Sequence, residues 1–305
     1  MNTKFFLLFI FLFILFGVIS VSLYRYDPLV IHKNKSEVTI LKNIAYIDDT
    51  NPKHQLDIYL PKDKKNFPIV HFVHGGYWTS GDKDYYAFAT GLYGNIGTTL
   101  AKNGIGVVVQ NYRLSPETNI VGQVDDVRSA IEWTAKNISQ YGGDHTNIYL
   151  MGHSAGGHIA TLFGTNLSLL QEKNLEQNIT GFIDLSGIID VPNMIAMSDA
   201  DFNSRVSFPV FTKDTEHQKK YSPSTYIKNS LPKFLIIIGE HDFPIIQSQT
   251  NQLVEALEQK PQYHILQGQS HIEIVTQFGK KNDVITPLLI NFIEQNTREK
   301  IKNSD

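Results

Sequence analysis

Short apolar runs recur along the chain from about residue 37, separated by longer segments with helical periodicity. Val38–Ile47 and Gln55–Leu60 alternate apolar and polar residues on either side of Thr50-Asn51-Pro52, which predicts an antiparallel hairpin. Six further runs are almost wholly apolar, as is typical of strands buried on both faces of a parallel sheet. These runs are Phe67–Val73, Ile105–Gln110, Ile148–Met151, Gly181–Leu185, Phe234–Ile238 and Tyr263–Leu266.

The segments between these runs have the spacing of amphipathic helices. Val124, Val127, Ile131 and Ala135 recur every three or four residues and form one apolar stripe. The predicted helices are Tyr85–Lys102, Val121–Gln140, Gly156–Leu170, Ile245–Gln259 and Val275–Asn296. Repeated alternation of strand and helix predicts an α/β fold with a doubly wound, mostly parallel sheet.

One long stretch, residues 188–231, departs from this alternation. It contains three prolines and several aromatic and methionine residues, but it lacks a strand pattern and a regular apolar period. Irregularly spaced apolar residues are suited to lining a pocket, so the stretch is predicted to be a small cap inserted over the sheet. The alternative is a long connecting helix and loop.

The N-terminus carries a separate apolar segment. Phe5–Tyr24 is a run of 20 residues without charge, and a helix of that length spans roughly 30 Å of hydrocarbon. Residues 1–24 are therefore predicted to be a cleaved signal peptide or an uncleaved membrane anchor. Residues 25–36 form a polar linker, and residues 37–305 form one catalytic domain. Both a signal peptide and an anchor would place that domain outside the cytoplasm. The domain is then expected to be secreted, periplasmic or attached to a membrane.

Composition narrows the function. The 305 residues include 27 Lys and Arg, 30 Asp and Glu, and no Cys, with a net charge of −3. This balance argues against a nucleic-acid-binding surface, and the lack of Cys excludes disulfides, zinc-thiolate sites and a thiol nucleophile. We expect no metal site, because His71 and His74 are three residues apart on an extended segment and face opposite sides.

Ser154 is the strongest candidate for a catalytic residue. It lies in Gly152-His153-Ser154-Ala155-Gly156, a G-x-S-x-G motif directly after an apolar strand and before a helical stripe. In that context the motif predicts a sharp strand-to-helix turn that exposes a nucleophilic hydroxyl. The turn also places the serine at a helix N-terminus, where backbone N–H groups stabilise developing negative charge.

A second loop is predicted to stabilise an oxyanion. His74-Gly75-Gly76-Tyr77-Trp78 follows the strand Phe67–Val73. The N–H groups of Gly75 and Gly76, with that of Ala155 after the nucleophile, are predicted to form an oxyanion hole. Tyr77 and Trp78 are predicted to contact the substrate.

Where a serine in a G-x-S-x-G motif is the nucleophile of a catalytic triad, the acid and the base follow it in the sequence. Asp242 lies on the loop after the strand Phe234–Ile238, and His271 lies on the loop after Tyr263–Leu266. Both loops end at the sheet edge where open α/β sheets bind ligands. Glu240 is the weaker candidate for the acid. Tyr112-Arg113 and Asp125-Asp126 are interpreted as supporting structure behind the site.

Several stretches together resemble α/β-hydrolases of the esterase and lipase group, in particular carboxylesterase-like enzymes that include kynurenine formamidases and isoprenylcysteine methylesterases. The matching stretches, within residues 45–296, are HGGYW, NYRLSPE, QVDDVRSAIEW, YGGD, YLMGHSAGGHIA, GEHD and the late SH. The resemblance implies Ser154 as nucleophile, His271 as base, Asp242 as acid and the same oxyanion donors. HGGYW is especially similar to the formamidases, whereas YLMGHSAG resembles the methylesterases.

The sequence thus predicts a serine carboxylic ester hydrolase that needs no cofactor and acts on a small-molecule ester. The alternative within enzymes is an amidase acting on N-formylkynurenine-like substrates. Formamidases of this group are usually soluble, so the N-terminal apolar run argues against that choice. A third alternative is a binding module with a hydrolase fold and no activity.

Overall fold

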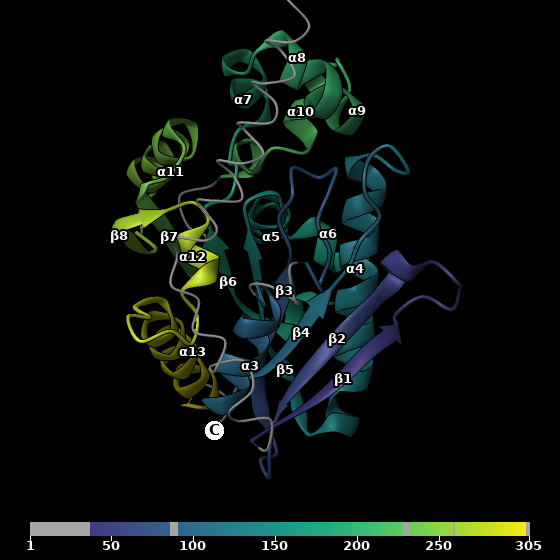
Figure 1. Ribbon diagram of the computed structural model, residues 1–305, viewed down its shortest axis with the longest axis vertical. Helices are drawn as coiled ribbons and strands as arrows, with labels where there is room; N and C mark the ends of the chain where they lie inside the picture. Colours follow the sequence, from purple (N-terminus) through teal and green to yellow (C-terminus); the bar gives the residue numbers. More distant parts are fainter. Residues whose placement is uncertain (1–36, 86–90, 228–231, 259, 303–305) are drawn as a thin grey trace, which may run out of the picture. The chain divides into compact units, whose positions relative to one another are not determined.

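An eight-stranded sheet forms the centre of the computed structural model, with helices on both of its faces (Figure 1). The structure describes residues 37–85, 91–227, 232–258 and 260–302. The predicted N-terminal segment and linker, residues 1–36, lie outside these ranges. Within the described residues, no helix combines the length and the apolar character needed to cross a membrane.

The strands form a mostly parallel sheet, as the sequence predicts. Their order is β1-β2-β4-β3-β5-β6-β7-β8. Only β2 runs against its neighbours, pairing antiparallel with β1 and with β4. The bounds are β1 Val38–Ala45, β2 Gln55–Pro61, β3 Phe67–Val73, β4 Gly106–Gln110, β5 Gly143–His153, β6 Ile179–Leu185, β7 Phe234–His241 and β8 Gln262–Ser270.

The helices bury apolar stripes against the two faces. α4 (Ile120–Asn137), α5 (Ala155–Thr165) and α11 (Pro244–Ala256) contribute to one buried cluster. On the other face, α3 (Gly94–Lys102), α12 (Glu273–Thr276) and α13 (Ile285–Lys302) contribute to a second. α6 (Ser168–Gln171) is a short helix after α5. Burying both faces explains why the inner parallel strands are almost wholly apolar, whereas β8 at the sheet edge is more exposed and more polar.

Two predicted helices are shorter or broken. Residue Gly91 has a φ of 57° and Gly279 a φ of 73°, values outside the helical region. The described part of the first helix therefore begins only at Gly94, and the last predicted helix divides into α12 and α13. Asp283 then starts α13, accepting hydrogen bonds from the N–H groups of Ile285 (3.0 Å) and Thr286 (2.9 Å).

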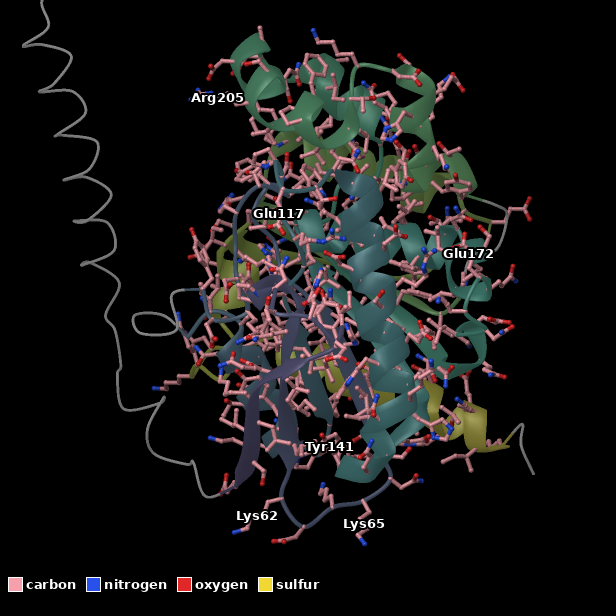
Figure 2. The ribbon with its side chains drawn as sticks, turned by 90° about the vertical axis from the view of Figure 1, so that its right-hand side faces the viewer. Lys62, Lys65, Glu117, Tyr141, Glu172 and Arg205 are labelled. Atoms are coloured by element: carbon pink, nitrogen blue, oxygen red, sulfur yellow. The ribbon has the colours of Figure 1, made fainter. Side chains whose placement is uncertain are left out.

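The segment predicted as a cap folds into short helical pieces. These are α7 Val191–Met197, α8 Ala200–Phe202, η4 Asn203–Ser207, α9 Phe208–Phe211, α10 Thr215–Lys220 and η5 Pro223–Tyr226. Figure 2 shows Arg205 at one end of the described residues and Lys62 and Lys65, in the loop before β3, at the other. The helical pieces therefore lie at the carboxyl ends of the parallel strands, the edge that carries the candidate site. The alternative of one long connecting helix is wrong.

Candidate active site

Ser154 stands on a strained turn between β5 and α5. Its φ of 55° and ψ of −119° are unusual for a residue with a side chain. A Cβ on Gly152 would lie 2.1 Å from the carbonyl oxygen of Gly156, and a Cβ on Gly156 would lie 2.1 Å from that of Val73. Only glycine fits at these two positions, which explains the G-x-S-x-G spacing. The turn is held by a 2.9 Å hydrogen bond from the Ser154 N–H to Leu185 O.

Asp242 and His271 form a buried pair from the loops after β7 and β8. His271 Nδ1 lies 2.9 Å from Asp242 Oδ1, and both residues are less than a tenth exposed. Burial opposes ionisation of Asp242, but the hydrogen bonds from His271 and Ser186 prevail and hold the pKa of this carboxyl below its usual value. The carboxylate is thus charged at neutral pH and can orient the imidazole.

Ser186 is a partner of this acid that the sequence analysis did not assign. Its hydroxyl lies 2.5 Å from Asp242 Oδ2 and is fully buried, directly after β6. Phe243 N–H donates to Asp242 Oδ1 at 2.8 Å. The signal in the sequence was the Ser-Gly pair at the end of a predicted strand, at the same sheet edge as the other candidates.

Ser154 and His271 are linked through His153, the residue before Ser154. His153 Nε2 lies 3.0 Å from the carbonyl oxygen of His271, and the two rings are 4.7 Å apart. The Ser154 hydroxyl itself makes no hydrogen bond to any described residue. The bond from serine to base is therefore not formed here, as is common before substrate binds.

The loop after β3 lies against Ser154. A Cβ on Gly75 would stand 3.1 Å from Ser154 Cβ. The N–H of Gly75 donates to the Tyr93 hydroxyl at 3.2 Å, so it already has a partner. The next three residues, Gly76, Tyr77 and Trp78, all have positive φ, at 124°, 55° and 60°. Successive residues of this kind turn their N–H groups toward one concavity.

Several backbone N–H groups of the loop after β3 and of the first turn of α5 remain open. Those of Gly76, Tyr77 and Ala155 have no hydrogen-bond acceptor among the described residues. A Cβ on Gly76 would meet Ser80 O at 2.1 Å, so the tight loop requires glycine there. The sequence analysis did not single out the Tyr77 N–H, because its direction depends on the positive φ of Tyr77, which the sequence does not reveal.

Tyr77 and Trp78 occupy different environments. Tyr77 is 47% exposed and its ring meets Phe202 of the cap edge-on at 5.9 Å. Trp78 is 2% exposed, with its indole packed edge-on against His158 at 5.4 Å and Phe211 at 4.9 Å. Tyr77 is therefore accessible to a substrate, whereas the Trp78 side chain packs between cap and core.

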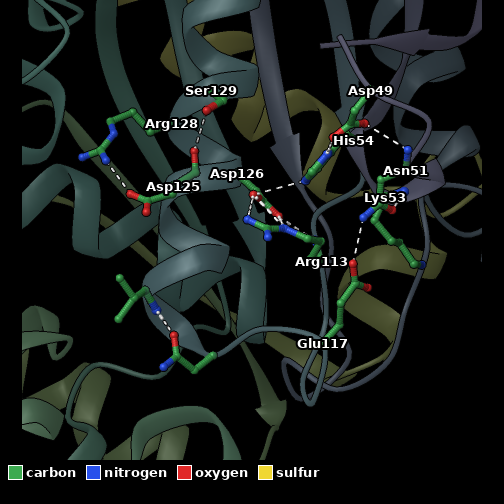
Figure 3. A network of polar contacts seen from close by, with 12 residues as sticks. Asp49, Asn51, Lys53, His54, Arg113, Glu117, Asp125, Asp126, Arg128 and Ser129 are labelled. Carbon is green, nitrogen blue, oxygen red and sulfur yellow. Dashed lines mark hydrogen bonds and ion pairs between the residues drawn. The ribbon is translucent and has the colours of Figure 1, made fainter. Parts of the chain in front are cut away.

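The residues interpreted as supporting structure hold the strand ends behind the site. Figure 3 shows the Arg113 guanidinium directed at Asp126 on α4, with contacts of 2.6 and 2.9 Å. The Tyr112 hydroxyl donates to His74 O at 3.0 Å, and the two rings stack at 4.4 Å. Both contacts fix the start of the Gly75–Gly76 loop relative to the sheet.

The remaining candidates lie apart from the acid–base pair. Glu240 is exposed and accepts a hydrogen bond from Gly268 N–H at 2.7 Å, and His241 is exposed beside it. His71 is fully buried and contacts Gln110 and Thr134. Within the described part of the chain, no group of three or more His, Asp or Glu side chains has an arrangement that could hold a metal ion.

A family model described as BD-FAE matches residues 56–257. The chain belongs to the BD-FAE family. This match spans β2 to α11 and includes Ser154, Asp242 and the Gly75–Gly76 loop. The sheet order and the turn at Ser154 are those of an α/β-hydrolase, the carboxylesterase-like group that the motifs resemble.

Individual relatives point to esterases and to a formamidase. A probable isoprenylcysteine alpha-carbonyl methylesterase from Oryza sativa subsp. japonica is 29% identical, over 78% of this chain and 59% of its own. A kynurenine formamidase from Danio rerio is 24% identical, over 85% of this chain and 84% of its own. Esterase B from Lactobacillus rhamnosis superposes with a TM-score of 0.76 at 20% identity, covering 88% of this chain and 89% of its own. The chain thus spans less than two thirds of that methylesterase's length.

Proposed function

We propose that the chain is a serine hydrolase that cleaves a carboxylic ester through Ser154, His271 and Asp242. The observation that carries the proposal is the buried His271–Asp242 pair, 2.9 Å apart, joined through His153 to the turn that bears Ser154. Membership of the BD-FAE family and the esterase names among the relatives support it.

In this mechanism the Ser154 hydroxyl attacks the ester carbonyl while His271 Nε2 accepts its proton. The charged Asp242 keeps Nδ1 protonated and stabilises the imidazolium. The carbonyl oxygen, now an oxyanion, accepts hydrogen bonds from the open N–H groups of Gly76, Tyr77 and Ala155. His271 then protonates the leaving alcohol, and water hydrolyses the acyl-enzyme by the same steps.

The surroundings of the base favour an apolar substrate. Phe243 is 45% exposed and its ring lies 4.8 Å from that of His271, where the leaving group must depart. Tyr77, on the oxyanion side, is also about half exposed. Apolar surface next to the reacting atoms gains free energy when it is covered by apolar substrate groups.

A formamidase acting on N-formylkynurenine-like substrates is the second candidate. It is favoured by the coverage of the Danio rerio relative, which extends over 84% of that protein and 85% of this chain. The chemistry would be the same, with His271 protonating a leaving amine.

The proposal is tested with purified wild type and Ser154→Ala on p-nitrophenyl acetate and butyrate and on N-formylkynurenine. We expect wild-type ester hydrolysis and a loss of at least about 10³-fold in the variant. A wild-type rate equal to that of Ser154→Ala on every substrate would overturn the proposal and favour a binding module. Faster turnover of the formamide than of both esters would favour the second candidate.

A further inference from the structure

His153 joins two parts of the site that the sheet keeps apart. In the strand order, β8 lies three places from β5, about 14 Å at the usual strand spacing. His271 O nevertheless lies 3.0 Å from His153 Nε2, so the end of β8 comes closer to the turn at Ser154 than the strand order alone would place it. Among the described residues, the 3.0 Å contact from His153 Nε2 to His271 O is the one hydrogen bond between the turn at Ser154 and this loop.

The protonation state of the His153 ring follows from its surroundings. The His271 carbonyl can only accept, so Nε2 carries the proton and donates. Nδ1 is buried without a partner, and the position of a Cβ on Gly75 is 3.1 Å from it. Burial first, and the neighbouring His271 second, lower the pKa of His153 to about 3. The ring is thus neutral near pH 7 and is fixed between the base loop and the oxyanion loop.

We propose that His153 is a positioning residue, whose Nε2–H holds the backbone of His271 so that the imidazole stands beside the Ser154 hydroxyl. This inference rests on the proposed function, because it assigns the geometry that the Ser154–His271 proton transfer needs. His153 contacts the ring and the backbone carbonyl of His271. It acts through the carbonyl of the base and by contact with Gly75.

The test compares two substitutions of nearly equal length and shape. His153→Gln places an amide N–H near the position of Nε2, whereas His153→Met fills the same space without a donor. We expect His153→Met to lower kcat by about 10- to 100-fold, the cost of a misplacement near 1 Å, and to change KM less than about threefold. His153→Gln should stay within about fivefold of the wild-type kcat.

A second readout does not depend on the substrate. The rate at which a fluorophosphonate labels Ser154 should fall in His153→Met and recover in His153→Gln, while both variants show wild-type circular dichroism. Equal kcat values and labelling rates in the two variants would overturn the inference, whether both are fast or both are slow. Failure of the proposed function is distinct, because it would appear as absence of hydrolysis and of labelling in the wild type.

Discussion

Asp184 is a buried carboxyl behind the site that the mechanism does not use. It lies at the end of β6, where Oδ1 accepts a 2.8 Å hydrogen bond from the Gly187 N–H. Oδ2 has no partner within hydrogen-bond geometry among the described residues, although the Thr161 side chain lies near it. Burial raises the pKa of Asp184 to about 7. Ionising this group in the folded protein is therefore unfavourable.

We expect Asp184→Asn to stabilise the protein above neutral pH. Because the folded pKa is raised above its ordinary value of 3.8, the unfolded chain ionises first and folding stability falls between about pH 4 and 7. The free-energy cost of ionising the buried Asp184 is absent below about pH 4 and complete above about pH 7. An asparagine avoids it, so the free energy of unfolding at pH 8 should rise by about 1 to 3 kcal/mol. Urea unfolding of wild type and variant from pH 4 to 8 measures this gain.

The control for this prediction is Asp48→Asn, which removes an exposed carboxyl. It removes one negative charge from the surface and so serves as the reference for the loss of a carboxylate. If Asp184→Asn lowers stability at pH 8, or if its difference from wild type does not grow with pH, the assignment of a raised pKa is wrong.

At the scale of elements, left-handed glycines decide where helices end. Gly279 separates α12 from α13, and a Cβ added there would lie 2.6 Å from Thr99 Oγ1 of α3. Gly268 in β8 has a similar φ, 69° against 73°, but a Cβ there would meet nothing within 4 Å. A side chain at Gly268 would therefore add backbone strain alone, whereas one at Gly279 would add backbone strain and a close contact with α3.

Gly268→Ala should therefore lower the free energy of unfolding by about 1 kcal/mol, the cost of a left-handed residue with a side chain. Gly279→Ala should lower it by about 2 to 3 kcal/mol, because the contact with Thr99 adds to that strain. Urea denaturation followed by circular dichroism measures both. Equal losses would mean that Thr99 turns away without cost, contrary to this expectation.

These elements also show what the sequence could predict. Each predicted strand matches one of β1 to β8, because burial on both faces makes the inner parallel strands apolar and the alternation of apolar and polar residues marks the β1–β2 hairpin. The helix from Val121 was predicted within a few residues, since its stripe faces one apolar cluster. The breaks near Gly91 and Gly279 were missed, because a glycine in a helical pattern does not reveal its φ.

The candidate site was identified from residue type and order, and its contacts could not be predicted in that way. Ser154, Asp242 and His271 follow from their places after strands, and the structure joins two of them directly. The Tyr93 contact with Gly75 was not predictable, since a tyrosine before a helix carries no sign of which loop its hydroxyl meets. The export or anchor role of residues 1–24 stays a prediction, because these residues lie outside the described ranges.

At the scale of the whole molecule, Trp78 connects the helical pieces of residues 188–231, the Gly75–Gly76 loop and the core. Its indole packs against Phe211 of α9 and donates to His158 Nδ1 at 3.3 Å. Its carbonyl accepts hydrogen bonds from Ser115 N–H at 3.0 Å and Gln123 Nε2 at 2.8 Å. The backbone of Trp78 has one of the three positive φ values in the loop after β3. Its side chain packs against Phe211 and so connects this loop to α9.

Trp78→Ala should impair both stability and catalysis, whereas Trp133→Ala should impair stability alone. Truncating the buried Trp78 is expected to cost about 3 to 5 kcal/mol, and the loosened loop should lower kcat by about tenfold as the N–H groups of Gly76 and Tyr77 lose their fixed direction. Trp133 is half-buried on α4 and packs beside Tyr141 at 6.3 Å, so its loss should cost about 1 to 2 kcal/mol with kcat unchanged. Urea unfolding and ester hydrolysis of the two variants test this, with both assayed well below their unfolding midpoints. A Trp78→Ala enzyme that keeps the wild-type kcat would show that the cap and the oxyanion loop hold their geometry independently.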